Sequence, residues 1–208
     1  MTIVLTAPLL RAGPGLLDAL ERLPRIGILF AEPVGGDPGA SDFSGHAVIC
    51  GYGRIGRELV DALAARGIGY VVIEYNPHVV RELRARGVAT IYGDAANAAV
   101  LEHAHVERAR LLAVLVPDRT VCEQATRVSR ALNRRLDIVA RAGSVGDLER
   151  LRQAGATEVV QPEFEVGVEV VRHSLRRFGI GGMELTSLIA GRRATFYRAA
   201  AADRDLGR

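Results

Sequence analysis

The stretch His46-Ala-Val-Ile-Cys-Gly-Tyr-Gly-Arg-Ile-Gly56 decides the fold of this 208-residue chain. Its first five residues predict a short buried strand, and the pattern G-x-G-x-x-G follows at once. Ile55, Leu59 and Leu63 then recur at helical spacing and predict a helix. A glycine-rich turn between a strand and a helix is the context in which this pattern indicates a dinucleotide-binding βαβ unit.

The three glycines each have a physical task in such a unit. Gly51 permits the tight turn, Gly53 lets the backbone approach a pyrophosphate, and Gly56 lets the helix pack close to the sheet. The free N–H groups at the start of the helix, together with the helix dipole, would then hold the anion. The alternative is that the glycines serve only the turn.

An acidic residue ends the next predicted strand. Glu74 follows the first glycine at about the 20-residue spacing that the fingerprint expects. Its carboxylate would accept hydrogen bonds from ribose hydroxyls and would repel a 2′-phosphate, which favours NAD or an adenosine nucleotide over NADP. The spacing therefore favours nucleotide binding over a simple turn.

Strands and helices alternate through the middle of the chain. The pattern predicts strands over 46–50, 70–74, 88–92, 111–116, 137–140 and 158–160. It predicts helices over 77–86, around 98–103, from 117–118 to about 133, and over about 145–154. Such alternation is typical of parallel strands joined by right-handed crossovers. The fold class expected is α/β, with a Rossmann-like, doubly wound, six-stranded parallel sheet.

Three parts follow from the pattern. Residues 1–45 form an N-terminal leader that ends in a Gly/Pro-rich linker, and 46–162 form the nucleotide-binding domain. In the last part, 163–208, a helix is predicted over 163–178, with glycines and an Ala/Arg-rich, flexible tail after it. The helix carries one apolar stripe, made of Phe164, Val168, Val171, Leu175 and Phe178.

Four charged residues lie where ligands bind in such sheets, and each has a second interpretation. Arg54 would clamp phosphate oxygens or be a solvated side chain, and Arg141 would line the crevice or form an ion pair. Asp94 would receive an adenine amino group or a ribose hydroxyl, and Asp118 would lie on the crevice rim, unless each caps a helix. The predicted nucleotide-binding residues are Gly51, Tyr52, Gly53, Arg54, Ile55, Gly56, Glu74, Tyr75, Asn76, Gly93, Asp94, Ala95, Val116, Pro117, Asp118 and Arg141.

Composition excludes several classes of function. The 27 basic residues are all arginine, so P-loop enzymes, Schiff-base enzymes and protein kinases, which need a lysine, are excluded. A net charge of +3 is too small to indicate nucleic-acid binding. The two cysteines, Cys50 and Cys122, suggest a reducing compartment. No catalytic residue is predicted. No metal site is predicted either, because no cluster of cysteines or carboxylates accompanies His103 and His105. The longest apolar run is too short to span a membrane.

Four motifs, in order, resemble one family. They are His46–Gly56, Val72-Ile-Glu74, Tyr92-Gly-Asp-Ala95 and Ala154-Gly-Ala-Thr-Glu-Val-Val-Gln-Pro162. Together they resemble the TrkA-N domain, also called the RCK N-terminal or KTN domain. The leader is similar to the end of the last membrane helix of a Kef-type potassium/proton antiporter, which such a domain follows.

The resemblance implies regulation rather than catalysis. Domains of this family control potassium channels and transporters from the cytoplasmic face of the cell membrane. The expected ligand is NAD(H) or an adenine nucleotide (AMP, ADP or ATP). The expected partners are a second copy, giving a homodimer or higher even oligomer through 163–178, and a membrane transporter part. A second, RCK-C-type domain is not evident after 178.

Two other hypotheses remain open. An NAD-dependent oxidoreductase needs a catalytic acid or base and a substrate domain, yet His173 is the only histidine after the sixth predicted strand. A structural dimerisation module with a vestigial crevice would bind no adenine nucleotide.

Overall fold

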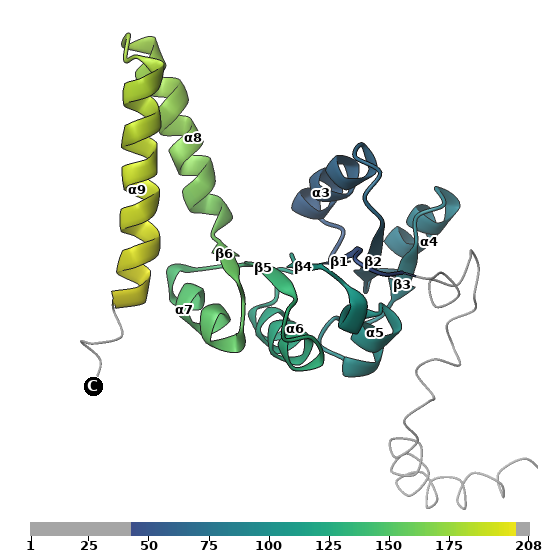
Figure 1. The fold of residues 1–208 in the computed structure, drawn as a ribbon. Coiled ribbons are helices and arrows are strands. Elements are labelled where there is room, and N and C mark those ends of the chain that lie inside the picture. Colours follow the sequence, from purple (N-terminus) through teal and green to yellow (C-terminus); the bar gives the residue numbers. More distant parts are fainter. Residues whose placement is uncertain (1–42, 203–208) are drawn as a thin grey trace, which may run out of the picture. The chain divides into compact units, whose positions relative to one another are not determined.

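The computed structural model describes residues 43–202, and Figure 1 shows their arrangement. The predicted leader, apart from residues 43–45, and the last six residues of the predicted tail lie outside this described part. Within 43–202, no helix combines the length and the apolar character that crossing a membrane requires.

Six parallel strands form one sheet in the order β3-β2-β1-β4-β5-β6. Their bounds are β1 Ala47–Cys50, β2 Tyr70–Glu74, β3 Thr90–Tyr92, β4 Leu111–Val114, β5 Asp137–Arg141 and β6 Glu158–Val160. The chain runs outward from β1 to β3 and then returns to the other side of β1 with β4. The predicted doubly wound, Rossmann-like α/β class is therefore confirmed.

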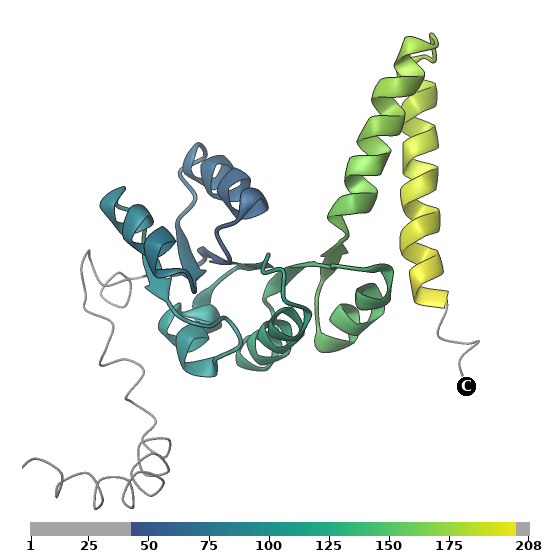
Figure 2. The same ribbon diagram turned by 180° about the vertical axis from the view of Figure 1, so that it is seen from behind.

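Helices cover both faces of the sheet (Figures 1 and 2). Helices α3 (Arg54–Ala64) and α4 (Pro77–Ala85) cover one face. The other face carries α5 (Ala98–His103), a short 3-10 turn η2 (Val106–Arg108), α6 (Arg119–Leu132) and α7 (Val145–Ala154). In β1, Ala47 and Ile49 belong to the core under α3 and α4, while Val48 and Cys50 belong to the opposite core. This period of two is expected when both faces of a strand are buried.

Element boundaries differ from the predictions by a few residues. Strand β3 begins at Thr90, because Gly87 has a φ of +74° and the Thr90 hydroxyl donates to the Val88 carbonyl in a local turn. Strand β4 ends at Val114, where its pairing with Cys50, the last residue of β1, ends. Helix α4 begins as predicted, since the Asn76 side chain accepts a hydrogen bond from the His78 N–H.

The predicted flexible tail is wrong over 182–202. Helix α8 (Pro162–Arg177) replaces the predicted 163–178 almost residue for residue, and a second helix, α9 (Gly182–Ala202), follows it. Alanine and arginine have high intrinsic helix propensity, and Leu185 and Ile189, four residues apart, are buried. Figure 2 shows α9 running back alongside α8.

The apolar stripe of α8 has its partner in the same chain. The Phe164 ring stacks on Phe196 with centroids 3.8 Å apart and nearly parallel planes, and Tyr197 meets Phe164 edge-on. Val168 is buried. The stripe therefore gives no reason of its own to expect a second copy, although Phe178 at its end is exposed.

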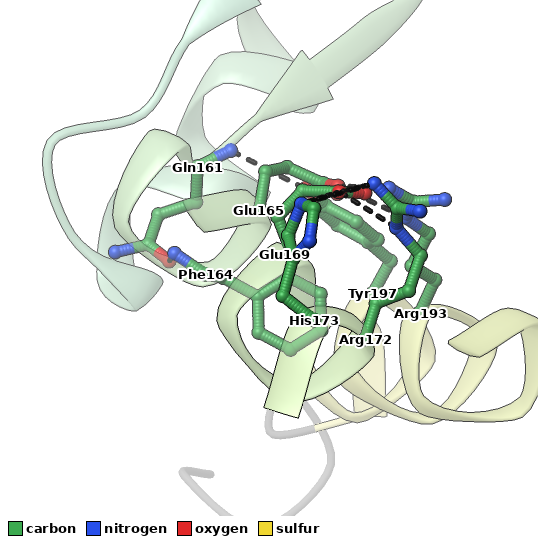
Figure 3. A network of polar contacts seen from close by, with 8 residues as sticks. All are labelled: Gln161, Phe164, Glu165, Glu169, Arg172, His173, Arg193 and Tyr197. Carbon is green, nitrogen blue, oxygen red and sulfur yellow. Dashed lines mark hydrogen bonds and ion pairs between the residues drawn. The ribbon is translucent and has the colours of Figure 1, made fainter. Parts of the chain in front are cut away.

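A network of polar contacts joins the start of α8 to α9 (Figure 3). Both Nε and Nη2 of Arg193 donate to Glu165 Oε2, at 2.9 and 2.7 Å. The Tyr197 hydroxyl donates to the other oxygen of Glu165 at 3.0 Å and accepts from the Gln161 N–H at 3.3 Å. Arg152 Nη2 donates to the Tyr197 carbonyl at 3.2 Å. Because Gln161 follows β6 directly and Arg152 lies in α7, these bonds tie α9 to the sheet domain.

Candidate functional site

The candidate site lies at the carboxyl ends of the central strands. After β1 the chain enters α3 on one face, and after β4 it enters α6 on the other. Such a reversal leaves an open crevice between the two strand ends, which is where ligands bind in sheets of this type. Gly51, Val116, Pro117 and Asp118 all lie at this reversal.

The glycine-rich loop requires glycine at two positions for steric reasons. Gly51 has a φ of +98°, and a Cβ there would lie 3.2 Å from Val116 Cγ1. A Cβ on Gly56 would collide with the Gly51 carbonyl oxygen, so the helix can approach the turn only without a side chain. Gly53 faces open space, which leaves the backbone accessible at the site where a phosphate would approach.

The first N–H groups of α3 are not satisfied by a cap. The N-cap residue is Gly53, which has no side chain to accept from them. Helices α4, α5, α6 and α8 differ, because an Asn, Asp or Gln side chain accepts a hydrogen bond at each N-terminus. Arg54 and Ile55, in the first turn of α3, are exposed. The start of α3, with the exposed Arg54 in its first turn, therefore presents N–H groups that no side chain of the described residues caps, and such a helix start is suited to an anion.

Glu74 ties the loop to the end of β2. Its Oε2 accepts from the Tyr52 N–H at 2.8 Å, and its Oε1 accepts from the N–H groups of Tyr75 and Asn76 at 2.9 and 2.8 Å. The carboxylate therefore shapes the loop in addition to any role with a ribose. Sequence spacing gave no signal for this contact, because it depends on the turn that the folded loop takes.

Tyr52 contributes its main chain to the rim and its side chain to the core. The ring is 3% exposed and packs under α3 and α4. Its hydroxyl accepts from Arg86 Nη1 at 3.0 Å, and the Arg57 guanidinium carbon lies 5.4 Å from the ring centroid. The Tyr52 side chain therefore anchors the loop and does not line the crevice.

The end of β3 joins the end of β2. The Gly93 N–H donates to the Glu74 carbonyl at 3.1 Å, and a Cβ on Gly93 would lie 2.7 Å from Val100. Asp94 is exposed, and its Oδ1 accepts from the Ala96 N–H at 2.9 Å. Asp94 therefore forms a local turn, while Asn97 is the cap of α5. Ala95 is buried.

The remaining predicted residues lie at the carboxyl ends of β4 and β5. Asp118 is the N-cap of α6, since its Oδ1 accepts from the Val121 N–H at 2.9 Å. Arg141, half-buried, lies 3.8 Å from Glu163, which is the ion pair weighed as its alternative. Val116 packs against the buried core, and Pro117 is exposed.

The other polar groups near this edge have structural partners. Arg119 Nε lies 3.0 Å from the buried carboxylate of Asp147, which also accepts from the Ser144 hydroxyl. Burial raises the pKa of Cys122 to about 11, so this thiol stays protonated at neutral pH. In the described part of the chain, His, Cys, Asp and Glu form no group of three or more that is able to hold a metal ion.

Comparison with known proteins identifies the family of this chain. A model of the TrkA-N domain matches residues 47–162, which are β1 to the start of α8. The chain belongs to the TrkA-N domain family. The predicted resemblance is therefore confirmed.

This TrkA-N chain is similar to parts of potassium transport proteins. It is 33% identical over 153 residues to the glutathione-regulated potassium-efflux system protein KefC of Cronobacter sakazakii, covering 74% of this chain and 24% of KefC. The chain spans about a quarter of the length of the curated relatives it matches. These relatives are transport proteins, so the expectation that this family member is not an enzyme is confirmed.

Three solved structures share its architecture. The TrkA-N domain of the Escherichia coli inner membrane protein ybaL is 35% identical, with a TM-score of 0.61 over 63% of this chain and 97% of that one. A Shewanella denitrificans Kef C-terminal domain in its AMP-bound form is 22% identical, with a TM-score of 0.65 over 76% of this chain and 98% of that one. The GsuK channel bound to NAD is 26% identical, with a TM-score of 0.55 over 72% of this chain and 27% of that one.

Proposed function

We propose that this TrkA-N domain binds an adenine nucleotide at the carboxyl edge of its sheet and thereby regulates potassium transport by a linked membrane part. The observation that carries the proposal is the uncapped start of α3 behind a loop that only glycines can form. Such a helix start favours an anion, and the sheet reversal provides the crevice in which the rest of a nucleotide fits.

Each part of the nucleotide has a candidate partner. The phosphate would meet the N–H groups of Gly53, Arg54 and Ile55, with the Arg54 guanidinium beside them. The ribose hydroxyls would lie near Glu74, whose Oε2 accepts one hydrogen bond from the residues that the structure describes and has room for another. Val116, Pro117, Asp118 and Arg141 would line the opposite side.

The relatives support this ligand class and a potassium transport context. AMP is bound by the Kef C-terminal domain, and NAD and ADP are bound by GsuK. KefC is named for potassium efflux. We propose that AMP, ADP, ATP or NAD(H) is the ligand here and that the domain works at the cytoplasmic face of the cell membrane, attached to a potassium/proton antiporter part.

Regulation would follow from linkage and needs no chemical step. A nucleotide shifts an equilibrium between two arrangements only by the difference in its affinity for them. We propose that the two arrangements belong to a homodimer, or a higher even oligomer, that pairs through the exposed side of α8. That side carries Val166 and Val170, which are 62% and 59% exposed.

Calorimetric titration tests the ligand. AMP, ADP, ATP, NAD and NADH are titrated into the wild type and into Arg54→Gln, which removes a charge from an exposed side chain. Saturable binding of at least one nucleotide is expected, with weaker affinity in the variant and the same melting temperature. Arg110→Gln, an exposed arginine just before β4, at the opposite end of the sheet, serves as the matched control.

Two outcomes would contradict the proposal. Absence of binding by all five ligands would favour the structural dimerisation module with a vestigial crevice. Hydride transfer from NADH to a small substrate would favour the oxidoreductase.

A further inference from the structure

The turn between α8 and α9 exposes apolar side chains at the end of the hairpin that points away from the strands (Figures 1 and 2). Phe178 is 82% exposed and Met183 is 91% exposed, the highest fractions of any large apolar side chain in the described residues. We infer that this hairpin tip, defined as residues 176–184, docks on the surface of an anionic lipid bilayer. The inference goes beyond the proposed function, which attaches the domain to a membrane part without any contact between the domain and lipid.

Main-chain hydrogen bonds hold the hairpin tip in one shape. Gly179 has a φ of +80°, and its N–H donates to the Arg176 carbonyl at 3.2 Å. The Ile180 N–H donates to the Leu175 carbonyl at 3.3 Å. These two bonds form a Schellman ending, in which the residue after the glycine covers the last turn of the helix. Ile180 is accordingly half-buried, whereas the Phe178 side chain is not required by this ending and stays exposed.

Exposed arginines lie beside the apolar side chains. Within residues 43–202, the guanidinium groups of Arg176 and Arg177 form no ion pair or hydrogen bond. With Glu184, the tip has two basic residues and one acidic residue, and the three glutamates of α8 all lie in its other half. Arginines in a last turn complement the helix dipole, but their exposed ends are still able to bind phosphate groups. Cations beside apolar groups are the combination that an anionic bilayer attracts.

The geometry of the hairpin favours a bilayer over a second copy of the chain. The 16 residues of α8 span about 24 Å, so the tip reaches a surface well clear of the sheet. Phe178 lies about 80° round the helix and about 12 Å along it from Val170, so pairing through the exposed valines does not by itself account for Phe178. A bilayer needs no matching hollow, because lipids rearrange around an inserted side chain.

Vesicle binding tests the docking. The full chain is sedimented with vesicles of phosphatidylcholine alone or of equal parts phosphatidylcholine and phosphatidylglycerol, and tighter binding to the anionic vesicles is expected. Phe178→Ser combined with Met183→Ser should weaken this binding about ten- to hundredfold, because two apolar side chains no longer leave water. Arg176→Gln combined with Arg177→Gln should weaken it about tenfold and reduce the preference for anionic lipid. Val145→Ser, at an exposed position of α7, is the matched control and should bind like the wild type.

Tryptophan fluorescence reports on the tip alone. The chain contains no tryptophan, so Phe178→Trp introduces a single fluorophore. Its emission should shift to shorter wavelength when anionic vesicles are added, and brominated lipid should quench it. Val145→Trp should show neither effect. Vesicle binding through another part of the chain would not produce this difference.

Three outcomes would overturn the docking. The first is equal binding of anionic vesicles by the wild type and the double serine variant, with circular dichroism showing the same helix content in both. The second is unchanged emission of Phe178→Trp on addition of vesicles. The third is an emission shift that appears without vesicles and grows with protein concentration, which would assign the tip to a second copy. Equal binding to the two kinds of vesicle would overturn the role of the arginines. None of these measurements involves a nucleotide, so the proposed function is tested separately.

Discussion

At the scale of single residues, steric contacts require glycine at the two outer positions of the loop, whereas the middle position is open to solvent. Gly51 needs its positive φ, and Gly56 lies against the Gly51 carbonyl. Gly53 has an ordinary φ of −78° and nothing near its missing Cβ. Glycine is therefore required by packing at Gly51 and Gly56 but not at Gly53, where the proposed function gives it the role of letting a ligand approach.

This difference gives a matched pair of variants. Gly56→Ala should lower the free energy of unfolding by about 1–3 kcal/mol, because the methyl group must push the helix from the turn. Gly53→Ala should leave stability nearly unchanged but weaken nucleotide binding, since its methyl group lies where phosphate would approach. Urea unfolding and calorimetry check the two results. Equal stability of the two variants would contradict the packing argument.

A buried histidine should make stability depend on pH. His46 is 3% exposed, its Nε2 lies 2.9 Å from the Ala104 carbonyl oxygen, and its buried Nδ1 has no partner in the described residues. Burial lowers its pKa below 6.5, assisted by His105 and Arg108 and opposed by the Ala104 hydrogen bond and by Glu107. The unfolded chain therefore takes up the proton first as the solution is acidified.

The free energy of unfolding should fall as the pH drops below about 6.5, the ordinary value for histidine, toward the lowered pKa of His46. Urea unfolding between pH 7.5 and 5.5 measures this slope. His46→Gln should remove part of the slope, whereas His173→Gln, at an exposed position on α8, should keep it. An identical slope in wild type and His46→Gln would contradict the assignment to His46.

At the scale of elements, the sequence predicts most of the sheet domain because hydrophobic periodicity and turn residues agree there. Helix α5 and strand β6 have the predicted bounds, and α4 begins at its predicted proline. Helix α9 was missed, because an Ala/Arg-rich segment has helix propensity but little apolar pattern, and only packing against α8 reveals it. The Glu74–Tyr52 contact was missed as well, because sequence spacing does not give the direction of a carboxylate.

Removing a single hydroxyl should destabilise the hairpin of α8 and α9 while the sheet stays folded. Tyr197→Phe removes a hydroxyl that donates to Glu165 and accepts from the Gln161 N–H, which should cost about 1 kcal/mol. Hydrogen exchange should then speed up in α9 and remain unchanged in β1. Arg176→Gln, at an exposed position of α8, is the control that should change neither. Equal acceleration in β1 would show that hairpin and sheet unfold together.

At the scale of the whole molecule, the proposed pairing of two copies depends on the exposed side of α8. Val170→Glu places a charge on this side and should shift the mass in light scattering from a multiple of the chain to a single chain. Val145→Glu changes a comparably exposed valine, on α7, and should leave the mass unchanged. A wild type that is monomeric at all concentrations would contradict pairing through this helix.

The position of β1 in the middle of the sheet determines how the molecule responds to a pulling force. Its four residues are all buried and are bonded in parallel to β2 on one side and β4 on the other. The preceding chain enters this strand at Ala47, and the glycine-rich loop follows it after Cys50. At 3.3 Å per residue, the four residues of the strand span about 13 Å. Tension that arrives through the chain before Ala47 therefore loads two hydrogen-bonded ladders in shear. Such a strand resists extension, so a pull at its start displaces the glycine-rich loop together with the whole sheet instead of peeling the strand away.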